Sequence, residues 1–367
     1  MKHPDGHVDV VVDADVLGRQ RTGDETYVRH LLTGLAALGS GLDIRAVARR
    51  AEVVPGGVLP EVLPVRSYAA RLAWGMPRCL SRLAPSVAHF QYVIPPAYRG
   101  AAVVTVHDLS FLLMPELEDR VDGWVLRTLV PRSMRRAARV LTVSQWTKRD
   151  IVERYGIAPE RIVVTPNGVD PAFSPGRRST DRGSGSHHAD RRYLLFVGAL
   201  RPRKDPLGML EAFALLPAEL RLVMVGPDKG DLPKVRATID RLGLAERVEL
   251  RGHVEPAELV SLYRGAACVV LPSRYEGFGL PVLEAMACGA PVVTTTAGAL
   301  PEVAGDAALV VPPGEPGALA EGVRRALFDR EALIQRGLER ARQFSWEETA
   351  RLTLEVYREV IAYAAAS

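Results

Sequence analysis

Short runs of β-branched and other apolar residues alternate along the chain with segments whose apolar residues recur at helical spacing. This alternation is typical of parallel sheets whose faces are covered by helices. Strands are predicted within residues 8–14, 42–48, 87–93, 101–108, 139–144 and 161–170, and a second series within residues 193–200, 220–227, 247–254, 267–273, 290–296 and 307–313. The pattern therefore predicts an α/β protein with two doubly wound, Rossmann-like domains.

A polar stretch, GRRSTDRGSGSHHADRR, separates the two series of strands and is predicted to be a flexible linker or loop. The length of 367 residues also favours two domains. At the end of the chain, Ser345 and Glu348 have the spacing of a capping box that begins an amphipathic helix. The expected parts are a first domain (1–175), a linker (176–192), a second domain (193–344) and a closing helix (345–367).

Composition narrows the class of protein. Hydrophobic residues make up 47% of the chain and charged residues 25%, which is typical of a globular protein. The net charge of +4 lies in the first half, because residues 1–175 hold 22 Lys+Arg and 18 Asp+Glu, a difference of +4. No basic stripe interleaved with aromatic residues accompanies this charge, so nucleic acid is not an expected partner. Any surface for an anionic partner is therefore expected in the first half.

Three cysteines, Cys79, Cys268 and Cys288, are far apart and lie in apolar surroundings. An odd number at such spacing indicates free thiols in a reducing compartment. The first residues lack the apolar run of a signal peptide, and no stretch of about 18 apolar residues occurs. A cytoplasmic protein is therefore predicted.

The stretch YEGFGLPVLEAMACGAP (275–291) carries two glutamates, Glu276 and Glu284, among apolar residues and glycines. It follows directly after the predicted strand within 267–273. In doubly wound sheets, ligands bind at the carboxyl ends of the strands. The two carboxylates are therefore candidates for ligand binding.

A short helix is predicted over 281–288, because Pro281 suits the first position of a helix. Its free N–H groups would attract phosphate, and Gly277 and Gly279 would let the backbone approach that anion. Glu284 is expected in the first turn. Carboxylates repel phosphate but accept hydrogen bonds from sugar hydroxyls. A second interpretation stays open, in which Glu284 only complements the helix dipole and the glycines only turn the chain.

The segment from Glu276 to Glu284, with PS before it and AMACGAPVV after it, resembles the EX7E signature of retaining GT-B glycosyltransferases of family four. VGALRPRKDP resembles the diphosphate-binding loop of that family, and VVTVHDLSF its sugar-facing histidine loop. LTVSQWTKRDI and IVVTPNGVD resemble the segments that lead to the domain linker, and FSWEETA the helix that crosses back to the first domain. The resemblance covers nearly the whole chain and implies two Rossmann-like domains facing across a cleft.

The resemblance also assigns roles to individual residues. Arg203 and Lys204 would bind the donor diphosphate, although two adjacent cations are also typical of a solvated turn. His107 would contact the transferred sugar with Asp108 as its support, although a histidine at a strand end is often structural. The expected catalytic residues are His107, Glu276, Arg203 and Lys204, and the expected donor-binding residues are Gly23, Arg203, Lys204, Gly277, Phe278, Gly279, Leu280 and Glu284.

One loop departs from the family pattern. Where the family has a glycine-rich TGIGRY-like motif near the donor phosphates and the acceptor, this chain has TGDETY, with Glu25 in place of the second glycine. Gly23 and its neighbours are expected to precede the helix YVRHLLTGLAAL. A polar acceptor would explain the change, and an ordinary helix start with acidic residues near the dipole is the alternative.

The resemblance implies transfer of a hexose from a nucleotide diphosphate sugar to an acceptor hydroxyl with retained configuration, in the synthesis of cell-envelope or polysaccharide glycans. It also implies that no metal is required. A front-face reaction is expected, in which Glu284 holds the ribose and Glu276 the transferred sugar. GDP-mannose is the first expectation for the donor, a UDP-sugar is the alternative, and the acceptor is a glycan or a lipid-linked glycan. A nucleotide-sugar isomerase or epimerase remains a second class. A dinucleotide oxidoreductase is disfavoured, because GFGLPV lacks the third glycine.

Three further features have open interpretations. The stretch 67–85 combines arginines with apolar residues, so it is either a segment that lies on an anionic membrane or an ordinary domain helix interrupted at Pro77. His253 follows a strand and would lie near the nucleotide base. His187 and His188 are too isolated for a metal site.

Overall fold

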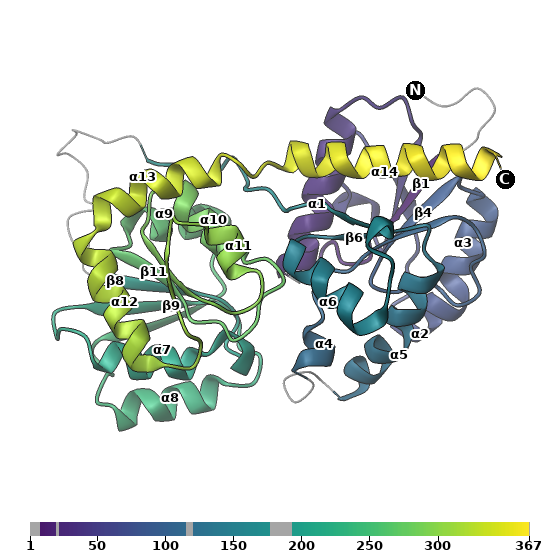
Figure 1. Cartoon of the computed structure of the whole chain (residues 1–367). Helices are drawn as coiled ribbons and strands as arrows, with labels where there is room; N and C mark the ends of the chain where they lie inside the picture. Colours follow the sequence, from purple (N-terminus) through teal and green to yellow (C-terminus); the bar gives the residue numbers. More distant parts are fainter. Residues whose placement is uncertain (1–7, 20–21, 115–119, 177–192, 367) are drawn as a thin grey trace. The chain divides into compact units, whose positions relative to one another are not determined.

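The computed structural model describes residues 8–19, 22–114, 120–176 and 193–366 and divides into two compact units (Figure 1). Unit 1 comprises Met1–Gly168 with Ser345–Ser367, and unit 2 comprises Val169–Phe344. The first boundary lies at Gly168 and not at the expected residue 175. One reason is that Val169 N donates to Phe344 O (3.3 Å), which ties the following segment to unit 2. Of the expected linker 176–192, only Gly176 lies within the described residues.

Unit 1 contains a seven-stranded parallel sheet in the order β3-β2-β1-β4-β5-β6-β7. Its strands are β1 (Val10–Asp13), β2 (Ile44–Ala48), β3 (Leu59–Val62), β4 (Val87–Gln91), β5 (Ala102–Thr105), β6 (Arg139–Thr142) and β7 (Ile162–Val164). Six of them lie within the predicted segments. The edge strand β3 was not predicted, because its sequence LPEV contains a proline and most of its side chains are exposed.

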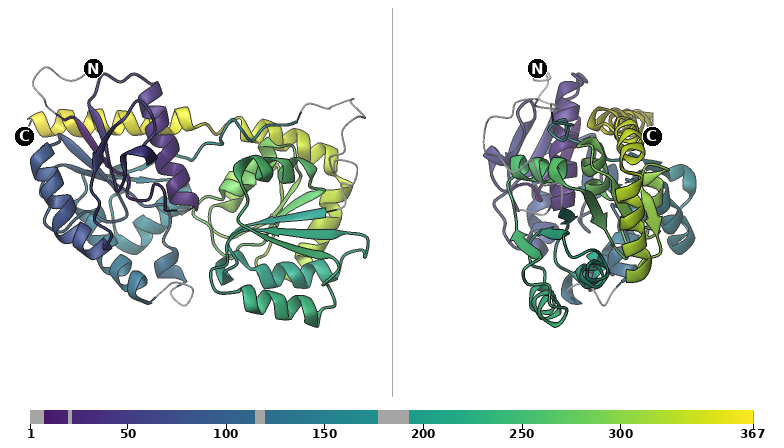
Figure 2. Two further views of the ribbon diagram at one scale, coloured as in Figure 1. Left: turned by 180° about the vertical axis from the view of Figure 1, so that it is seen from behind. Right: turned by 90° about the vertical axis from the view of Figure 1, so that its left-hand side faces the viewer.

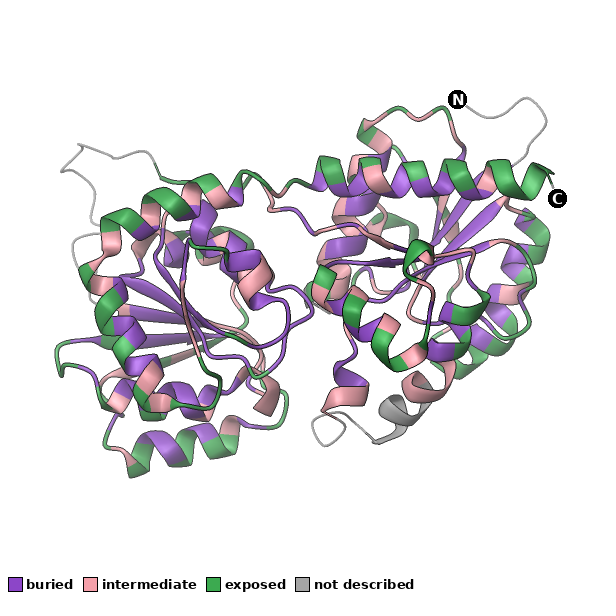
Figure 3. Ribbon diagram, viewed as in Figure 1, coloured by how far each residue is buried: buried purple, intermediate pink, exposed green. Residues whose placement is uncertain are grey.

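Helices cover both faces of this sheet (Figure 2). They are α1 (Thr22–Ala37), α2 (Tyr68–Ala70), the π-helix η2 (Arg71–Gly75), α3 (Met76–Leu83), α4 (Ser110–Leu113), α5 (Arg120–Arg136), α6 (Gln145–Tyr155) and α14 (Trp346–Ala366), with short 3-10 turns η1 (Ala51–Val53) and η4 (Pro159–Arg161). The central strands are buried along their length, while the helices alternate buried and exposed positions (Figure 3). The core of unit 1 therefore lies on the two faces of its sheet.

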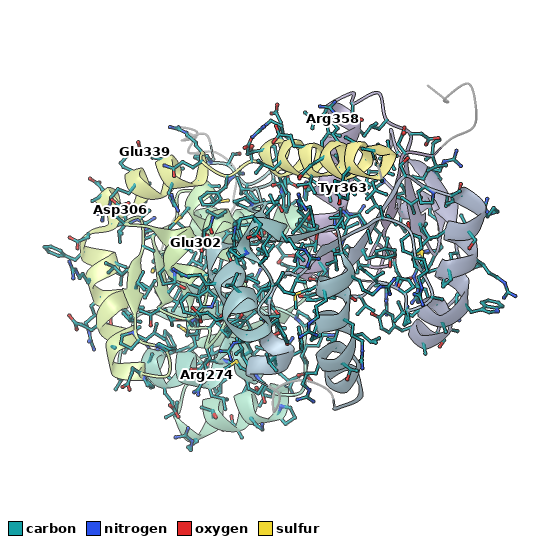
Figure 4. The ribbon with its side chains drawn as sticks, turned by 45° about the vertical axis from the view of Figure 1, so that its right-hand side comes forward. Arg274, Glu302, Asp306, Glu339, Arg358 and Tyr363 are labelled. Atoms are coloured by element: carbon teal, nitrogen blue, oxygen red, sulfur yellow. The ribbon has the colours of Figure 1, made fainter. Side chains whose placement is uncertain are left out.

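The closing helix α14 belongs to unit 1, where it packs against α1, β4 and β6. Ser345 Oγ accepts the N–H of Glu348 (3.1 Å), which is one half of the predicted capping box. The carboxylate of Glu348 pairs instead with Arg351. Tyr357 of α14 is completely buried, and its hydroxyl lies 2.6 Å from Nδ1 of the buried His89. Arg358 and Tyr363 of α14 are exposed (Figure 4).

Unit 2 contains a six-stranded parallel sheet in the order β10-β9-β8-β11-β12-β13. Its strands are β8 (Tyr193–Val197), β9 (Arg221–Val225), β10 (Val248–Gly252), β11 (Cys268–Leu271), β12 (Val292–Thr295) and β13 (Leu309–Val311), all within predicted segments. Its helices are η5 (Pro202–Lys204), α7 (Pro206–Ala214), α8 (Leu232–Arg241), α9 (Pro256–Gly265), α10 (Leu280–Ala287), α11 (Leu300–Ala304), α12 (Pro316–Phe328) and α13 (Arg330–Ala341).

Both sheets are doubly wound, and each has a point where the strand order reverses. In unit 1 this switch point lies between β1 and β4, and in unit 2 between β8 and β11. Connections that leave neighbouring strands in opposite directions open a crevice at their carboxyl ends, where ligands bind. Ligand-binding residues are therefore expected in the loops after β1 and β4 and in those after β8 and β11.

The stretch 67–85 forms α2, η2 and α3 without interruption at Pro77, which lies in the first turn of α3. Its apolar side belongs largely to the core, since Leu72, Met76 and Leu80 are buried. Arg71 is also buried, at 1% exposure, and its guanidinium pairs with Asp13 in unit 1 (2.6 Å). The segment is therefore a domain helix over most of its length.

Two further observations concern compartment. The three cysteines are free and buried, as expected. Over the ranges that the structure describes, no helix combines the length and the apolar character needed to cross a membrane.

Candidate functional site

The loops after β8 and β11 are joined to each other at the switch point of unit 2. Arg274 N donates to the carbonyl of Arg203 (2.8 Å). The Arg274 guanidinium, labelled in Figure 4, contacts both carboxylate oxygens of Asp205 at 3.2 and 3.3 Å. Asp205 adopts φ +52° and caps α7 by accepting the N–H of Gly208 (3.3 Å). These bonds fix the short helix η5, and with it the two expected cations, beside the loop that carries Glu276.

Lys204 and Glu276 form an ion pair between the two loops. Lys204 Nζ donates to Glu276 Oε1, which also accepts the hydroxyl of Ser273 (2.7 Å). The Lys204 side chain is 14% exposed and that of Glu276 7%. Thr295 holds the Ser273 carbonyl with a bond of 2.6 Å, so the loop is attached to β12 as well. The structure thus brings together two of the expected catalytic residues.

Positive charge exceeds negative charge around this pair. Burial raises the pKa of Glu276, but the charges of Lys204 and Arg203 outweigh it and hold the pKa below its usual value. Burial lowers the pKa of Lys204, and Arg203 and Arg201 lower it further against the opposing charge of Glu276. Arg203 thus acts on both members of the pair, and Arg201 acts on Lys204, in addition to the effect of burial. Such a site favours an additional anion.

Two glycines allow close backbone packing around the glutamate loop. Gly279 adopts φ +103°, and a Cβ there would lie 2.6 Å from Leu300. Gly298, after β12, adopts φ +64°, and a Cβ there would lie 2.2 Å from the carbonyl oxygen of Glu276. Local packing therefore requires glycine at 279, and Gly298 is an equally constrained position that the sequence did not single out.

The remaining residues of the motif have packing roles. Gly277 is buried, and the Phe278 ring lies edge-on to Phe344 with centroids 5.9 Å apart.

Helix α10 begins at Leu280, one residue before the predicted start at 281. Because of this shift, Glu284 is the fifth residue of the helix and does not lie in its first turn as expected. The helix dipole therefore gives no sufficient reason for a glutamate at this position.

Glu284 lies next to the buried Tyr263 of α9. The Tyr263 hydroxyl donates to Glu284 Oε2 (2.8 Å). Burial raises the pKa of Glu284 to about 7, although the hydrogen bond from Tyr263 lowers it, and the charge of Asp170 adds to the rise. The two glutamates of the motif thus differ, since Glu276 is held as an anion and Glu284 titrates near neutral pH.

In unit 1, His107 follows β5 and is 8% exposed. Its Nε2 lies 2.9 Å from Oε1 of Gln91, which ends β4, and its ring lies edge-on to Tyr27 with centroids 4.7 Å apart. Burial lowers the pKa of His107, opposed by the charges of Asp24 and Asp108, so the imidazole is neutral at neutral pH. Asp108 also begins α4 by accepting the N–H of Ser110 (3.0 Å).

The TGDETY loop differs from the expectation. Helix α1 begins at Thr22, so Gly23, Asp24 and Glu25 lie in its first turn and not before it. Glu25 Oε1 accepts the N–H of Gly18 (2.9 Å) and the guanidinium of Arg29 (2.9 Å). The glutamate that replaces the family's second glycine therefore holds the loop after β1 against the helix.

Sequence reasoning missed several residues that hold the candidates in place. Ser273 could have been identified from the sequence, because it belongs to the dipeptide PS that precedes Glu276 in the motif. Gln91 lies near the carboxyl end of the predicted strand 87–93, so the rule that ligands bind at such ends could have identified it. Tyr263 had no local signal, because its partner is 21 residues away on another helix. His253 is exposed after β10, and His187 and His188 lie outside the described residues.

Two family models match the chain, one on each half. The model described as Glycosyltransferase Family 4 matches residues 21–173, and the one described as Glycosyl transferases group 1 matches residues 177–344. In sequence, the chain is similar to O-antigen chain mannosyltransferase B of Escherichia coli, with 34% identity over 266 residues that cover 70% of each protein. It is also similar to the D-inositol 3-phosphate glycosyltransferase of Acidothermus cellulolyticus, with 35% identity over 62% of this chain but only 54% of that enzyme.

Solved structures share the fold at low sequence identity. Sucrose-phosphate synthase of Thermosynechococcus elongatus superposes with a TM-score of 0.79 and 20% identity, over 97% of this chain and 100% of that one. HepE of Anabaena, solved in complex with UDP and glucose, superposes with a TM-score of 0.71 and 20% identity, over 95% and 99% of the two chains.

Proposed function

The chain belongs to the family-four glycosyltransferases, and on that premise we propose that it transfers a hexose from a nucleotide diphosphate sugar to an acceptor hydroxyl with retained configuration. The observation that carries the proposal is the positive charge next to Glu276, where Lys204 and Arg203 lie in η5, in the loop after β8. A diphosphate supplies the anion that this site favours.

The residues at the switch point of unit 2 take separate roles. Arg203 and Lys204 bind the diphosphate, and Glu284 accepts hydrogen bonds from the ribose. Glu276 holds Lys204 with one oxygen and contacts the transferred sugar. In unit 1, the neutral imidazole of His107 is assigned to the sugar as well.

A front-face reaction fits these roles. The bond between the anomeric carbon and the diphosphate oxygen breaks, and the acceptor oxygen bonds to the same face of the sugar. The departing phosphate oxygen takes the proton of the acceptor hydroxyl. Lys204 and Arg203 stabilise the negative charge that collects on that oxygen, which is the largest contribution expected of fixed charges in a transferase. We propose that these two cations make a bound metal unnecessary.

GDP-mannose is the proposed donor, and a glycan of the cell envelope the proposed acceptor, free or linked to a lipid. The support is the similarity to a mannosyltransferase that acts on O-antigen chains. A UDP-sugar is the alternative donor. A nucleotide-sugar isomerase or epimerase is the alternative reaction, and it differs in needing no acceptor.

A donor panel tests the proposal. Purified protein is incubated with GDP-mannose or with UDP-sugars, with and without a mannose-containing oligosaccharide, and in the presence of chelator. The proposed function predicts nucleotide diphosphate release that requires the oligosaccharide and persists in chelator, with an α-linked product from an α-linked donor. Lys204→Ala abolishes release, and Arg241→Ala, which removes an exposed cation on α8, is the matched control. Rearranged donor without acceptor would instead establish the isomerase.

Peripheral contact with an anionic membrane through unit 1 is proposed as a further part of this function. Trp74 is 54% exposed with the Arg78 guanidinium 4.7 Å from its ring centroid, and Tyr68 on α2 is 39% exposed. Leu59 and Val62 of the edge strand β3 are also exposed. The test is sedimentation with anionic vesicles, which should occur at low salt, weaken as salt is added and be lost in Trp74→Ser. Absence of sedimentation at low salt would contradict the contact.

A further inference from the structure

The carboxyl group of Glu284 is held at one oxygen only. Tyr263 donates to Oε2 at 2.8 Å, while Oε1 makes no hydrogen bond with any residue in the described ranges. Glu284 itself is partly exposed, and Tyr263 is completely buried. The protein therefore fixes one side of this carboxyl group and leaves the other available.

Tyr263 is in turn held by the segment that follows the boundary between the units. The ring of Phe173 lies edge-on to the Tyr263 ring, with centroids 5.8 Å apart. The next residue of α9, Arg264, donates from Nε to the carbonyl of Ser174 (2.7 Å) and from Nη2 to its hydroxyl (3.2 Å). All these residues belong to unit 2. The aromatic contact and the two bonds orient the phenol before any ligand arrives, which reduces the entropy lost on binding.

We propose that Tyr263 is a positioning residue for donor binding, which holds Glu284 Oε2 so that Oε1 is presented to the ribose hydroxyls of a nucleotide diphosphate. The inference rests on the proposed function, because it takes Glu284 as a donor-binding residue. It adds a residue from another helix and a segment, 169–174, to the donor site.

The pKa of Glu284 depends on the Tyr263 hydrogen bond, so the pH dependence of ligand binding distinguishes a positioning role of Tyr263 from a purely structural one. The pKa of Glu284, about 7, is raised first by burial, lowered by the Tyr263 hydrogen bond, raised by the charge of Asp170 and lowered by that of Lys204. Cys288 directly follows the last residue of the same helix, α10, but its pKa of about 12 leaves it neutral near pH 7. The charge of Arg264 lowers the pKa of Cys288, so Arg264 is a further charged group in this neighbourhood.

The sign of the pH effect follows from these contributions. A carboxylate accepts hydroxyl hydrogen bonds more strongly than a carboxylic acid, so donor affinity should increase as the pH rises through about 7. Tyr263→Phe removes the hydrogen bond that lowers the pKa, and the midpoint should move to higher pH. Asp170→Asn removes a negative charge that raises it, and the midpoint should move to lower pH.

The experiment measures the binding of GDP and UDP to the full chain by calorimetry between pH 5.5 and 8.5. The variants are Tyr263→Phe, Asp170→Asn and Glu284→Gln, and the matched control is Tyr363→Phe, which removes the hydroxyl of a 75% exposed tyrosine on α14. At pH 7, Tyr263→Phe should weaken the better nucleotide about tenfold, or about 1.4 kcal/mol. With donor sugar, KM should rise more than kcat falls. Glu284→Gln should remove the rise in affinity with a midpoint near pH 7 and leave only the pH dependence of the terminal phosphate of the nucleotide, whose second pKa is about 6.

The outcomes separate the two proposals. A wild type that binds neither nucleotide overturns both. If nucleotide binds and Glu284→Gln weakens it, but Tyr263→Phe behaves like Tyr363→Phe in affinity and midpoint, only the role of Tyr263 is overturned. If Tyr263→Phe does not fold, Phe173→Leu is measured in its place. This variant removes the aromatic contact that orients the Tyr263 ring and keeps the Tyr263 hydroxyl. It should shift affinity in the same direction by a smaller factor, and an unchanged affinity would contradict the inference.

Discussion

Replacing Lys204 by methionine leaves the Glu276 carboxylate buried without its main partner. The pair is 14% and 7% exposed, so water cannot fully replace the lost charge. Removing one member of a buried ion pair costs about 3–5 kcal/mol. Ser273 still donates to Glu276 and Arg203 still contributes positive charge, so a loss of about 3 kcal/mol in the stability of unit 2 is expected.

The double variant Lys204→Met with Glu276→Gln separates stability from function. It removes both charges, and exchanging a whole buried pair for neutral groups is often close to neutral in stability. Most of the loss should therefore be recovered relative to Lys204→Met alone. Turnover should stay at least about 100-fold below wild type in both variants, because the leaving diphosphate has lost a fixed cation.

Urea unfolding followed by two probes measures this effect unit by unit. All four tryptophans, Trp74, Trp124, Trp146 and Trp346, belong to unit 1, so their fluorescence reports that unit, while far-UV circular dichroism reports both. Lys204→Met should lower the urea midpoint by circular dichroism and leave the fluorescence midpoint nearly unchanged. A double variant no more stable than the single one would refute the reasoning, as would a single variant as stable as wild type.

Three further predictions follow from the geometry. In Arg203→Ala plus Lys204→Ala, the preference of the wild type for nucleoside diphosphate over monophosphate should largely vanish in equilibrium binding, because the distal phosphate loses its cations. Gly298→Ala should lower turnover at least about tenfold in initial-rate assays, since φ is +64° and its Cβ would lie 2.2 Å from a backbone oxygen of the glutamate loop. Tyr357→Phe should destabilise unit 1 by about 1–3 kcal/mol in tryptophan-monitored unfolding, because it leaves the Nδ1 of buried His89 without its hydrogen bond. An unchanged fluorescence midpoint would contradict this last expectation.

Most strands could be predicted from sequence because burial on both faces makes them continuous apolar runs, whereas the edge strand β10 (VELRG) was found by its alternation of apolar and polar residues. Twelve of the thirteen strands of the described residues lie within predicted segments. The exception, β3, is an edge strand that is exposed, so the same signal is missing. The pattern of apolar residues was thus sufficient to predict the strands that are buried in the core.

Pairing between distant residues could not be predicted in the same way. Lys204 and Glu276 are 72 residues apart, and the resemblance placed each beside the ligand without joining them. The position of Glu284 depends on where α10 begins, and a shift of one residue moved it out of the first turn. Both features depend on tertiary contacts, since η5 is fixed by Arg274 and the start of α10 by the left-handed backbone at Gly279.

The order in which the chain is made has a consequence for how unit 1 forms. Helix α14 belongs to unit 1, yet it follows the whole of Val169–Phe344 in the chain. At a synthesis rate of roughly 5–20 residues per second, the ribosome needs on the order of 10–35 s to make that intervening unit. During this interval the nascent unit 1 lacks the helix that covers His89 and packs on α1. Unit 2 is continuous and can fold first as a whole, so the unit that is begun first is completed last, and a ribosome that stops anywhere within unit 2 releases a chain in which neither unit is finished.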